Sequence, residues 1–246
     1  MKKSTYAVLL LFAVCTLLVL PAAAENSQTD RVITTSGYGE SVTTPDKVTI
    51  TFAVETNDPD VKIAQQQNAD RIAAVIAVMK NAGIEEKNIK TTGYSIYSWT
   101  VGEYNPGKWA NGTEVYEVTN TVQIISYDIE KAGEYIDLAV ANGANKVNNL
   151  QFGLSDAKQA TERTKALTAA VTSARSDANA VSAALGVKIS GTGVIAVDQS
   201  RYSTSYTSMN TFAKPEAAVM MDAGAGTTIQ SGELKTTATV SIVYTY

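Results

Sequence analysis

Residues 155–186 read SDAKQATERTKALTAAVTSARSDANAVSAALG, and the rest of the fold can be worked out from this stretch. Small or apolar residues recur in it in steps of three and four, which places them in one stripe on an α-helix. The stripe consists of Ala157, Ala160, Thr164, Leu167, Val171, Ala174, Ala178, Val181 and Leu185. Ser155 is a favourable N-cap, and Gly186 is suited to a left-handed stop. The pattern predicts a helix over residues 155–185, about 30 residues and roughly 45 Å long.

This predicted helix has an alanine-rich stripe, so another surface can pack closely against it. One interpretation is a coiled coil with a second helix. The other is a helix that lies across a sheet of its own domain, and we favour it because predicted strands surround the helix in the sequence. No residue in the helix suggests catalysis.

The predicted strands are distributed along the whole chain. Alternation of apolar and polar residues is clearest at Lys47–Glu55 and in the last segment, Glu233–Tyr246. The other predicted strands are Arg31–Val42, Ile89–Trp99, Glu114–Ser126, Lys146–Leu154 and Val187–Val197. The first two strands are close enough in sequence to form a hairpin.

Two further helices are predicted, one from Asp58 to Gly83 and one over Asp128–Asn142. The order of elements is then β-β-α-β-β-α-β-α-β-β. This order predicts an α+β fold, with a mainly antiparallel sheet and helices packed on one face.

Two connecting segments are unusually long. Thr100–Thr113 is predicted to be a wide hairpin loop, and Asp198–Ser231 is longer than a structureless loop in a compact domain usually is. We expect the second segment to be ordered in part by a partner or to be mobile. No internal stretch is rich enough in proline, glycine or charge to separate two domains, so residues 31–246 are predicted to form a single domain.

Residues 1–24 have the pattern of a signal peptide. Lys2 and Lys3 precede an apolar run from Tyr6 to Leu20, and alanines at 22–24 form a small-residue cleavage motif. The alternative is an uncleaved anchor, although the run is shorter than the roughly 20 residues that a membrane span prefers. Residues 25–30 are predicted to be a flexible leader. The sequence therefore predicts an exported protein of the periplasm, the cell surface or the extracellular space.

Composition excludes several classes of function. Removal of residues 1–24 would leave 18 basic and 24 acidic residues, a net charge of −6, so nucleic acid and anionic membrane surfaces are poor partners. The chain has no histidine, and its single cysteine, Cys15, lies in the predicted signal peptide. Catalytic triads with histidine, thiolate metal sites and peroxidatic thiols are therefore excluded. We expect no cofactor, no catalytic residue and no metal site.

Carboxylates are the main remaining route to catalysis, as acid–base pairs or as ligands of a divalent cation. The pairs Asp58/Asp60 and Glu85/Glu86 lie at a helix start and in a turn, where capping explains them. A carboxylate- or divalent-metal-dependent hydrolase of the cell envelope stays open as the alternative function.

A series of short motifs runs through almost the whole chain after residue 30. In order, these motifs are Gly37-Tyr38-Gly39-Glu40, Pro45-Asp46, Val54-Glu55-Thr56, Gly83-Ile84, Ile89-Lys90-Thr91-Thr92, Ala141–Asn145, Phe152–Asp156, Ala174–Ala178, Ala184–Val187 and Gly232-Glu233. Their order and spacing resemble the SIMPL-domain family, which includes periplasmic proteins described as oxidative stress defence proteins. The chain departs from the family pattern at Ser231, where proline is frequent, and in its two long loops.

The resemblance implies an exported α+β protein without an established catalytic activity. Some family members look like ring or channel-like assemblies, so it also implies a homo-oligomer that is ring-like in shape. The link to oxidative stress comes with no mechanism at the level of residues.

Aromatic residues gather around the loop Thr100–Thr113. Trp99, Tyr104 and Trp109 flank or occupy this loop and are candidate interface or binding residues, because aromatic side chains are large anchors. We predict that this hairpin end contacts a neighbouring subunit. Three nearby aromatic residues are instead expected to pack in the core: Tyr94, Tyr97 and Tyr116.

Two further features lie in the loops. Met209, Met220 and Met221 are candidate oxidation-sensitive residues, since exposed methionine is oxidised to the sulfoxide. The alternative, which we favour, is that Met220 and Met221 anchor the loop. Asn111 begins an N-glycosylation sequon on a predicted exposed loop. The sequence as a whole predicts an exported, non-enzymatic cell-envelope protein that acts through self-assembly or binding.

Overall fold

The computed structural model describes residues 31–102, 108–197, 204–206 and 226–246. The helices are α2 (Val61–Asn81), α3 (Ala132–Ala141) and α4 (Asp156–Leu185), with short 3-10 turns at Glu86–Asn88 and Ile129–Lys131. The strands are β1 (Val32–Thr43), β2 (Lys47–Asp58), β3 (Ile89–Thr100), β4 (Glu114–Ser126), β5 (Lys146–Gly153), β6 (Gly191–Val197), β7 (Thr204–Tyr206) and β8 (Leu234–Thr245). The predicted order of elements is confirmed, with the short β7 in addition.

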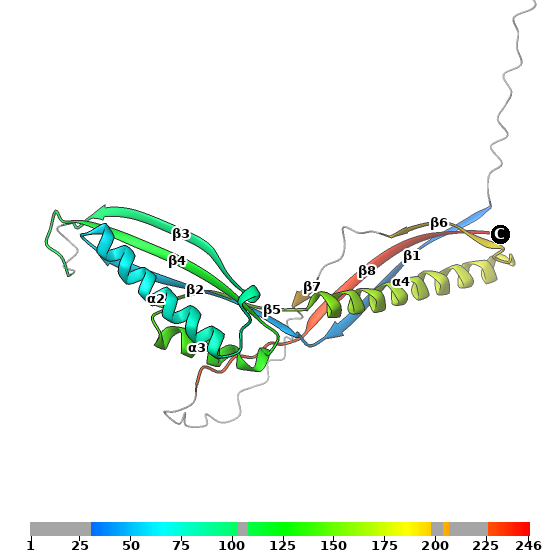
Figure 1. The fold of residues 1–246 in the computed structure, drawn as a ribbon. Helices are drawn as coiled ribbons and strands as arrows, with labels where there is room; N and C mark the ends of the chain where they lie inside the picture. Colours follow the sequence, from blue (N-terminus) through cyan, green and yellow to red (C-terminus); the bar gives the residue numbers. More distant parts are fainter. Residues whose placement is uncertain (1–30, 103–107, 198–203, 207–225) are drawn as a thin grey trace, which may run out of the picture.

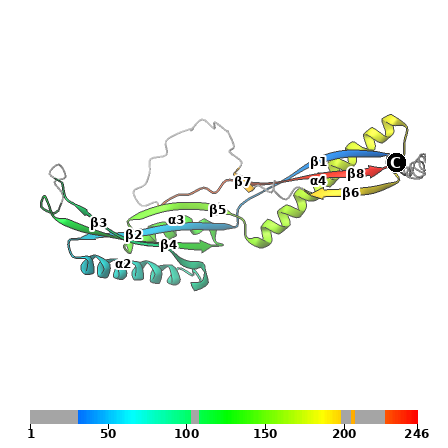
Figure 2. The ribbon, with the colours of Figure 1, turned by 90° about the horizontal axis from the view of Figure 1, so that it is seen from above.

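The strands form two sheets, which lie in two lobes along the length of an elongated molecule (Figures 1 and 2). One sheet has the order β1-β8-β6, with β7 also paired to β8, and α4 lies along it. The other has the order β3-β4-β2-β5, and α2 and α3 lie on one of its faces. All of these strand pairs are antiparallel. The α+β class is confirmed, but the strands divide between two sheets where one was expected.

The predicted hairpin of the first two strands is wrong. β1 pairs with β8 and β2 pairs with β4 and β5, so the chain passes from one lobe to the other between them. The link is held at the end of β5, because the backbone N–H of Asp46 donates to the carbonyl of Gly153 and the Asp46 carboxylate accepts from Ser155. These contacts hold the link between β1 and β2 at the junction of the two lobes, where the chain continues into the second sheet and does not turn back to form a hairpin.

Helix α4 packs on β1 at a very short distance. Any Cβ on Gly37 would overlap the carbonyl oxygen of Ala170, and one on Gly39 would overlap that of Ala166. Two glycines spaced by two lie on the same face of β1, so together they form a smooth surface for the helix backbone. The side chain of Thr35 completes this contact by donating a 2.9 Å hydrogen bond to the carbonyl oxygen of Ala174.

The buried line of α4 differs from the predicted stripe. The residues that face the sheet recur every four positions and are Glu162, Ala166, Ala170, Ala174, Ala178 and Ser182. Of the predicted stripe only Ala174 and Ala178 are buried, whereas Val171, Val181 and Leu185 are 41%, 41% and 60% exposed. The close approach explains the difference, because only one small side chain per turn fits beneath a helix whose backbone touches the strand. The prediction of Ser155 as N-cap and Gly186 as left-handed stop is confirmed.

The second lobe has a conventional apolar core between its sheet and α2 and α3. Its largest buried side chains include Phe52 and Ile50 from β2 and Met79 from α2. One buried polar residue was missed: Asn68 of α2 donates hydrogen bonds of 2.8 and 2.9 Å to the carbonyl oxygens of Val54 and Val118. These bonds tie α2 to two neighbouring strands.

Several predicted boundaries shift by a few residues. The N-cap of α2 is Asp60, while Asp58 accepts a hydrogen bond from the backbone N–H of Asp60. Strand β6 begins at Gly191 instead of Val187, because the chain first leaves α4 through a turn. No helix in the described part of the chain is long and apolar enough to span a membrane.

Candidate functional site

The predicted aromatic site lies at the free end of the β3–β4 hairpin. The rings of Trp99 and Trp109 meet edge to face, with centroids 6.4 Å apart and planes at 76°. The Nζ of Lys108 lies 5.4 Å from the ring centroid of Trp109, within the range of a cation–π contact. The buried Val101 secures this arrangement, since its backbone exchanges hydrogen bonds with the turn that ends the loop. The structure thus brings together two of the three predicted residues, and Tyr104 lies outside the described residues.

The strand that leads to this end, β3, has no buried side chain. Tyr94 and Tyr97 are each 54% exposed and Ile96 is 38% exposed, so the prediction that these tyrosines pack in the core is wrong. Tyr116 on β4 is partly buried. The reason is topological: β3 is the edge of its sheet, and α2 packs on the central strands β2 and β4. An edge strand without a buried face is an unusual place for large apolar side chains.

A second group of side chains lies where β2, β3, β4 and β5 run side by side. The Lys146 Nζ lies 2.7 Å from Glu55 Oε1, and the carboxyl group of Glu117 is close enough to Glu55 for each to shift the pKa of the other. Tyr97 lies directly opposite Glu117 on the neighbouring strand. We refer to Glu55, Tyr97, Glu117 and Lys146 as the carboxyl cluster.

Opposite pKa shifts distinguish the two carboxyl groups of this cluster. The hydrogen bond from Lys146 lowers the pKa of Glu55, against the smaller effect of burial. Burial raises the pKa of Glu117, and the hydrogen bond and charge of Glu55 raise it further. The negative charge of Glu117 in turn raises the pKa of Tyr97. Glu117 is therefore the carboxyl group of the pair that holds a proton more readily.

The carboxyl cluster was not predicted from the sequence. Strand alternation alone indicates that Glu55 lies on the same outer face of β2 as Lys47 and Thr49. It likewise places Glu117 on the same outer face of β4 as Thr119 and Thr121. It does not give the register, which places Glu117 opposite both Tyr97 and Asn57. Asp60 caps α2 as predicted. Glu85 makes no capping hydrogen bond through its side chain, and Glu85 and Glu86 instead form surface ion pairs with Lys87 and Lys80.

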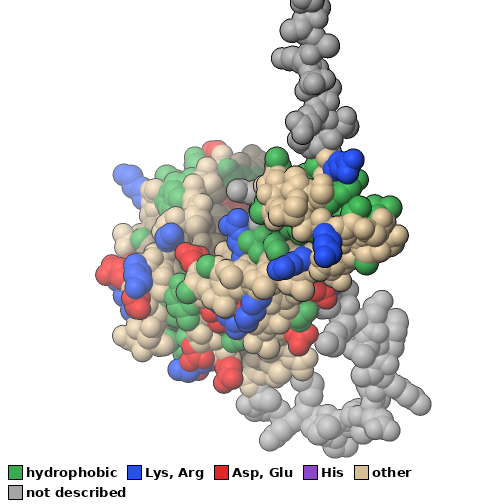
Figure 3. All heavy atoms as spheres, turned by 90° about the vertical axis from the view of Figure 1, so that its right-hand side faces the viewer, with side chains coloured by type: hydrophobic (Ala, Val, Ile, Leu, Met, Phe, Trp, Pro, Cys, Tyr) green, Lys and Arg blue, Asp and Glu red, His purple; other side chains and the backbone are tan. Residues whose placement is uncertain are grey.

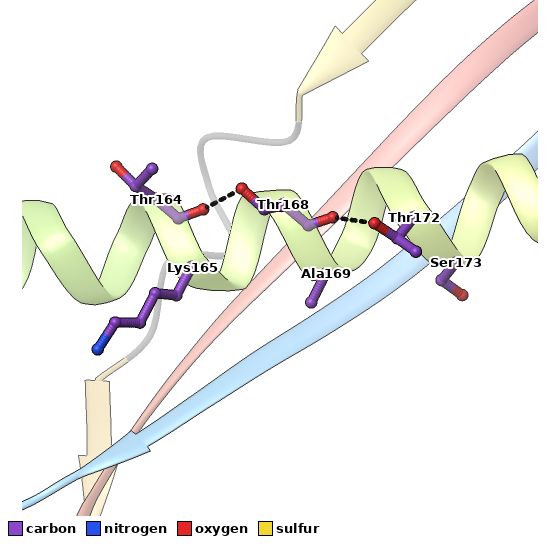
Figure 4. Close-up of a pocket in the computed structure, with 6 residues that line it drawn as sticks. All are labelled: Thr164, Lys165, Thr168, Ala169, Thr172 and Ser173. Carbon is purple, nitrogen blue, oxygen red and sulfur yellow. Dashed lines mark hydrogen bonds between the residues drawn. The ribbon is translucent and has the colours of Figure 1, made fainter.

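The outer surface of α4 has a shallow hollow lined by Thr164, Lys165, Thr168, Ala169, Thr172 and Ser173 (Figure 4). The hydroxyl of Thr168 donates to the carbonyl of Thr164, and that of Thr172 to the carbonyl of Thr168, so both hydroxyls are already satisfied. Lys165 is paired with Glu162 at 2.8 Å. The hollow therefore presents mainly methyl groups and has no free acid or base.

The remaining predicted sites are placed as follows. Asn111 lies in an exposed turn, which is accessible as a sequon requires. Met209, Met220 and Met221 lie outside the described residues, as do the predicted signal peptide and leader. Within the ranges that the structure describes, no three acidic side chains come together as a metal site.

Comparison with known proteins identifies relatives over most of the chain. The uncharacterized protein YggE of Edwardsiella ictaluri (strain 93-146) is 28% identical over 168 residues, which cover 68% of this chain and 67% of that protein. The 26 kDa periplasmic immunogenic proteins of Brucella melitensis and Brucella abortus are each 26% identical over 174 residues, which cover 68% of this chain and 69% of theirs. The sequence profile of SIMPL, a protein of unknown function (DUF541), matches residues 33–244. Apart from the first residue of β1 and the last of β8, this match includes all the described strands and helices, and the chain belongs to the SIMPL family.

Proposed function

We propose that this protein is exported to the cell envelope and acts there by self-assembly, without catalysing a reaction. The support for export is the signal-peptide pattern of residues 1–24, together with the relatives from Brucella that are named periplasmic. The support for a non-catalytic role is the absence of histidine from the whole chain and of cysteine after residue 15.

The observation that carries self-assembly is the exposed edge of β3. This strand is 12 residues long, pairs on one side with β4 and buries none of its side chains. A long edge strand presents unpaired backbone groups that can pair with a strand of another chain. Tyr94, Ile96 and Tyr97 would lose their exposure in such a contact, and the Trp99–Trp109 pair would extend it beyond the strand. The assembly that results is a homo-oligomer, and a ring is the closed form of a repeated head-to-tail contact.

Charged residues placed on the β3 edge test this proposal. The double variant Ser95→Lys/Tyr97→Lys changes two exposed positions of β3, and lysine on an edge strand opposes pairing. Its matched control is Asn149→Lys/Gln151→Lys, two exposed positions on β5 at the opposite edge of the same sheet. In sedimentation velocity, the β3 variant is expected to dissociate to a single chain while the β5 variant keeps the parent mass. Equal masses for all three proteins would contradict assembly through β3.

The aromatic end of the hairpin makes its own contribution to the proposed contact. Replacement of Trp109 and Tyr104 by alanine is expected to shift the oligomer toward smaller species, because interface aromatics often dominate binding free energy. An unchanged oligomer size would remove the hairpin end from the interface but leave the β3 edge in place.

One observation favours a hydrolase as a second candidate. Two carboxyl groups whose pKa values move in opposite directions are the arrangement that acid–base catalysis uses, and Glu55 and Glu117 show it. Activity against a panel of envelope glycosides and esters that is lost in both Glu55→Gln and Glu117→Gln would establish this function. The same panel without activity leaves the carboxyl cluster as a structural feature of the sheet.

The proposed link to oxidative stress comes from the family resemblance, and the candidate residues for it are Met209, Met220 and Met221. Mild peroxide followed by peptide mapping tests it, since a sacrificial methionine must be oxidised before the protein unfolds. Protection of Met220 and Met221 would end the proposal.

A further inference from the structure

A groove runs between the C-terminal half of α4 and the edge strand β6, in the lobe that does not contain β3. Its volume is about 760 Å³, which is within the usual range for sites that bind small molecules. Ile242 and Tyr244 of β8 lie at its floor. Val171 and Arg175 of α4 line one side and Ile195 of β6 lines the other.

The groove exists because α4 covers only part of its sheet. The sheet order is β1-β8-β6, and the helix packs on β1 and β8. The glycines that draw α4 close lie on β1, which places the helix axis over that side of the sheet. The face of β6 on the helix side is consequently uncovered, and none of the β6 side chains is buried.

A β-bulge turns two β6 side chains into the groove. Thr192 lies opposite Tyr244, but the next pair on this face is Ile195 opposite Ile242, so three steps on β6 match two on β8. Without the extra residue, Ile195 would project from the other face of the sheet. Bulges redirect side chains in this manner beside binding sites.

Exposed apolar side chains line both walls of the groove, alongside the polar side chains of Asn179, Ser182, Ser190 and Thr192. Ile195 is 56% exposed and Val171 is 41% exposed, although each lies beside buried apolar side chains of the sheet. Val187 and Ile189, which follow α4, extend the apolar lining and are partly buried. A long alkyl chain laid in this groove would remove apolar surface from water on both walls, at about 25 cal/mol per Å².

The charged groups at the groove are all cationic. Arg175 and Lys188 line it, and none of its described lining residues is acidic. Neither cation has an ion-pair or hydrogen-bond partner in the described part of the chain, whereas six other lysines do: Lys80, Lys87, Lys131, Lys146, Lys165 and Lys235. Figure 3 looks onto this end of the molecule and shows Lys and Arg side chains around hydrophobic ones. In a chain with a formal net charge of −4, this is a local reversal of sign.

We propose that the groove between α4 and β6 binds a long-chain carboxylate, with its alkyl chain along Val171 and Ile195 and its carboxylate between Arg175 and Lys188. An anion without an alkyl chain would leave the apolar walls exposed, and a neutral lipid would leave both cations without a partner. The ligand class therefore follows from the combination of the two features. This inference does not depend on self-assembly through β3, because that edge belongs to the other lobe.

Isothermal titration of the purified protein with laurate tests the proposal, with dodecan-1-ol and butyrate as the neutral and short-chain comparisons. Laurate is expected to bind with one site per chain, at least tenfold more tightly than either comparison. The double variant Arg175→Gln/Lys188→Gln is expected to lose at least tenfold in laurate affinity. Its control is Lys62→Gln/Lys90→Gln, two exposed lysines of the other lobe that change the net charge equally.

Three results would overturn the proposal: no laurate binding, equal binding of dodecan-1-ol, or equal laurate affinity in the two double variants. The variant Ile195→Asn distinguishes a bound carboxylate from the other possible occupant of the groove, which is a second copy of the chain. Its position is exposed, so the fold should tolerate the change, which circular dichroism checks. Loss of laurate affinity at an unchanged sedimentation mass supports the proposal. A changed mass with unchanged laurate affinity would make the groove a contact between copies and would contradict it.

Discussion

Ser155 donates two hydrogen bonds to Asp46, from its backbone N–H to Oδ1 over 2.7 Å and from its Oγ to Oδ2 over 2.6 Å. Asp46 lies in the link from β1 to β2, and Ser155 caps α4 just after β5. The Asp46 side chain therefore joins two passages of the chain between the lobes, through both the backbone and the side chain of Ser155. This junction fixes the start of α4 relative to the second sheet.

Loss of the Asp46 carboxylate should destabilise the protein. Asp46→Ala leaves the Ser155 N–H without its acceptor, and hydrogen bonds to a charged group contribute about 1.5–3 kcal/mol, so we expect a loss of about 2 kcal/mol in the free energy of unfolding. Urea denaturation measures it. Asp156→Ala, which removes only a first-turn charge of α4, serves as control with an expected cost of about 0.5 kcal/mol. Equal costs would show that Asp46 acts as a general negative charge near the helix start.

The close contact of α4 with β1 predicts a large effect of a single methyl group. Gly37→Ala would force the helix away from the strand, and overpacking of this kind costs about 3 kcal/mol. Gly93→Ala on β3 is the matched control, because its Cβ would lie 3.6 Å from Thr121, an ordinary contact. We expect Gly93→Ala to be neutral or to stabilise by up to about 1 kcal/mol. A Gly37→Ala protein as stable as its parent would refute the packing described for α4.

Glu162 makes stability depend on pH on the acid side. Its side chain is only 3% exposed, and hydrogen bonds from Lys165 and Ser41 lower its pKa in spite of burial. A lowered folded-state pKa means that the stabilisation is present above the usual carboxyl range, near pH 4–5, and is lost as the pH falls through the folded-state value. Glu162→Gln should therefore be less stable than the parent at pH 7 and converge with it toward pH 3. The exposed Glu134→Gln is the control, and a constant difference across pH would contradict this assignment.

Glu117 predicts the opposite behaviour. Burial and Glu55 raise the pKa of Glu117 in the folded protein. At neutral pH the ionised Glu117 therefore destabilises the folded state, and this cost disappears at pH values below the pKa that Glu117 has in the unfolded chain. Glu117→Gln is expected to raise the urea midpoint at pH 7 and to leave it unchanged near pH 3. Glu114→Gln, an exposed carboxylate on the same strand, should change neither. A lower midpoint for Glu117→Gln at pH 7 would show that the charged form of Glu117 is stabilising.

Features encoded by neighbouring residues were predictable from the sequence. The α4 cap at Ser155, its stop at Gly186 and the order of helices and strands all depend on residues within one or two turns. The pairing of β1 with β8 joins the two ends of the described chain, from Val32 with Thr245 to Thr43 with Leu234. Alternation identifies the inner face of such a strand but not its partner, so the division into two sheets was not predictable.

The same limit applies to the candidate sites. Trp99 and Trp109 were predictable because they flank one loop, whereas the carboxyl cluster assembles side chains from four strands. The groove depends on the position of α4 over β1, which two glycines on another element determine. The sequence predicted Val171 as part of the packing face of α4, and its place in a groove wall required the location of β6.

The mass of the protein in solution is the sharpest test of self-assembly through β3. Light scattering coupled to size exclusion, over a hundredfold range of concentration, gives the number of chains per particle. Self-assembly through β3 predicts a mass that is an integral multiple of the single chain and that falls to one chain in Ser95→Lys/Tyr97→Lys. A parent protein with the mass of one chain at every concentration would show that the protein does not self-assemble.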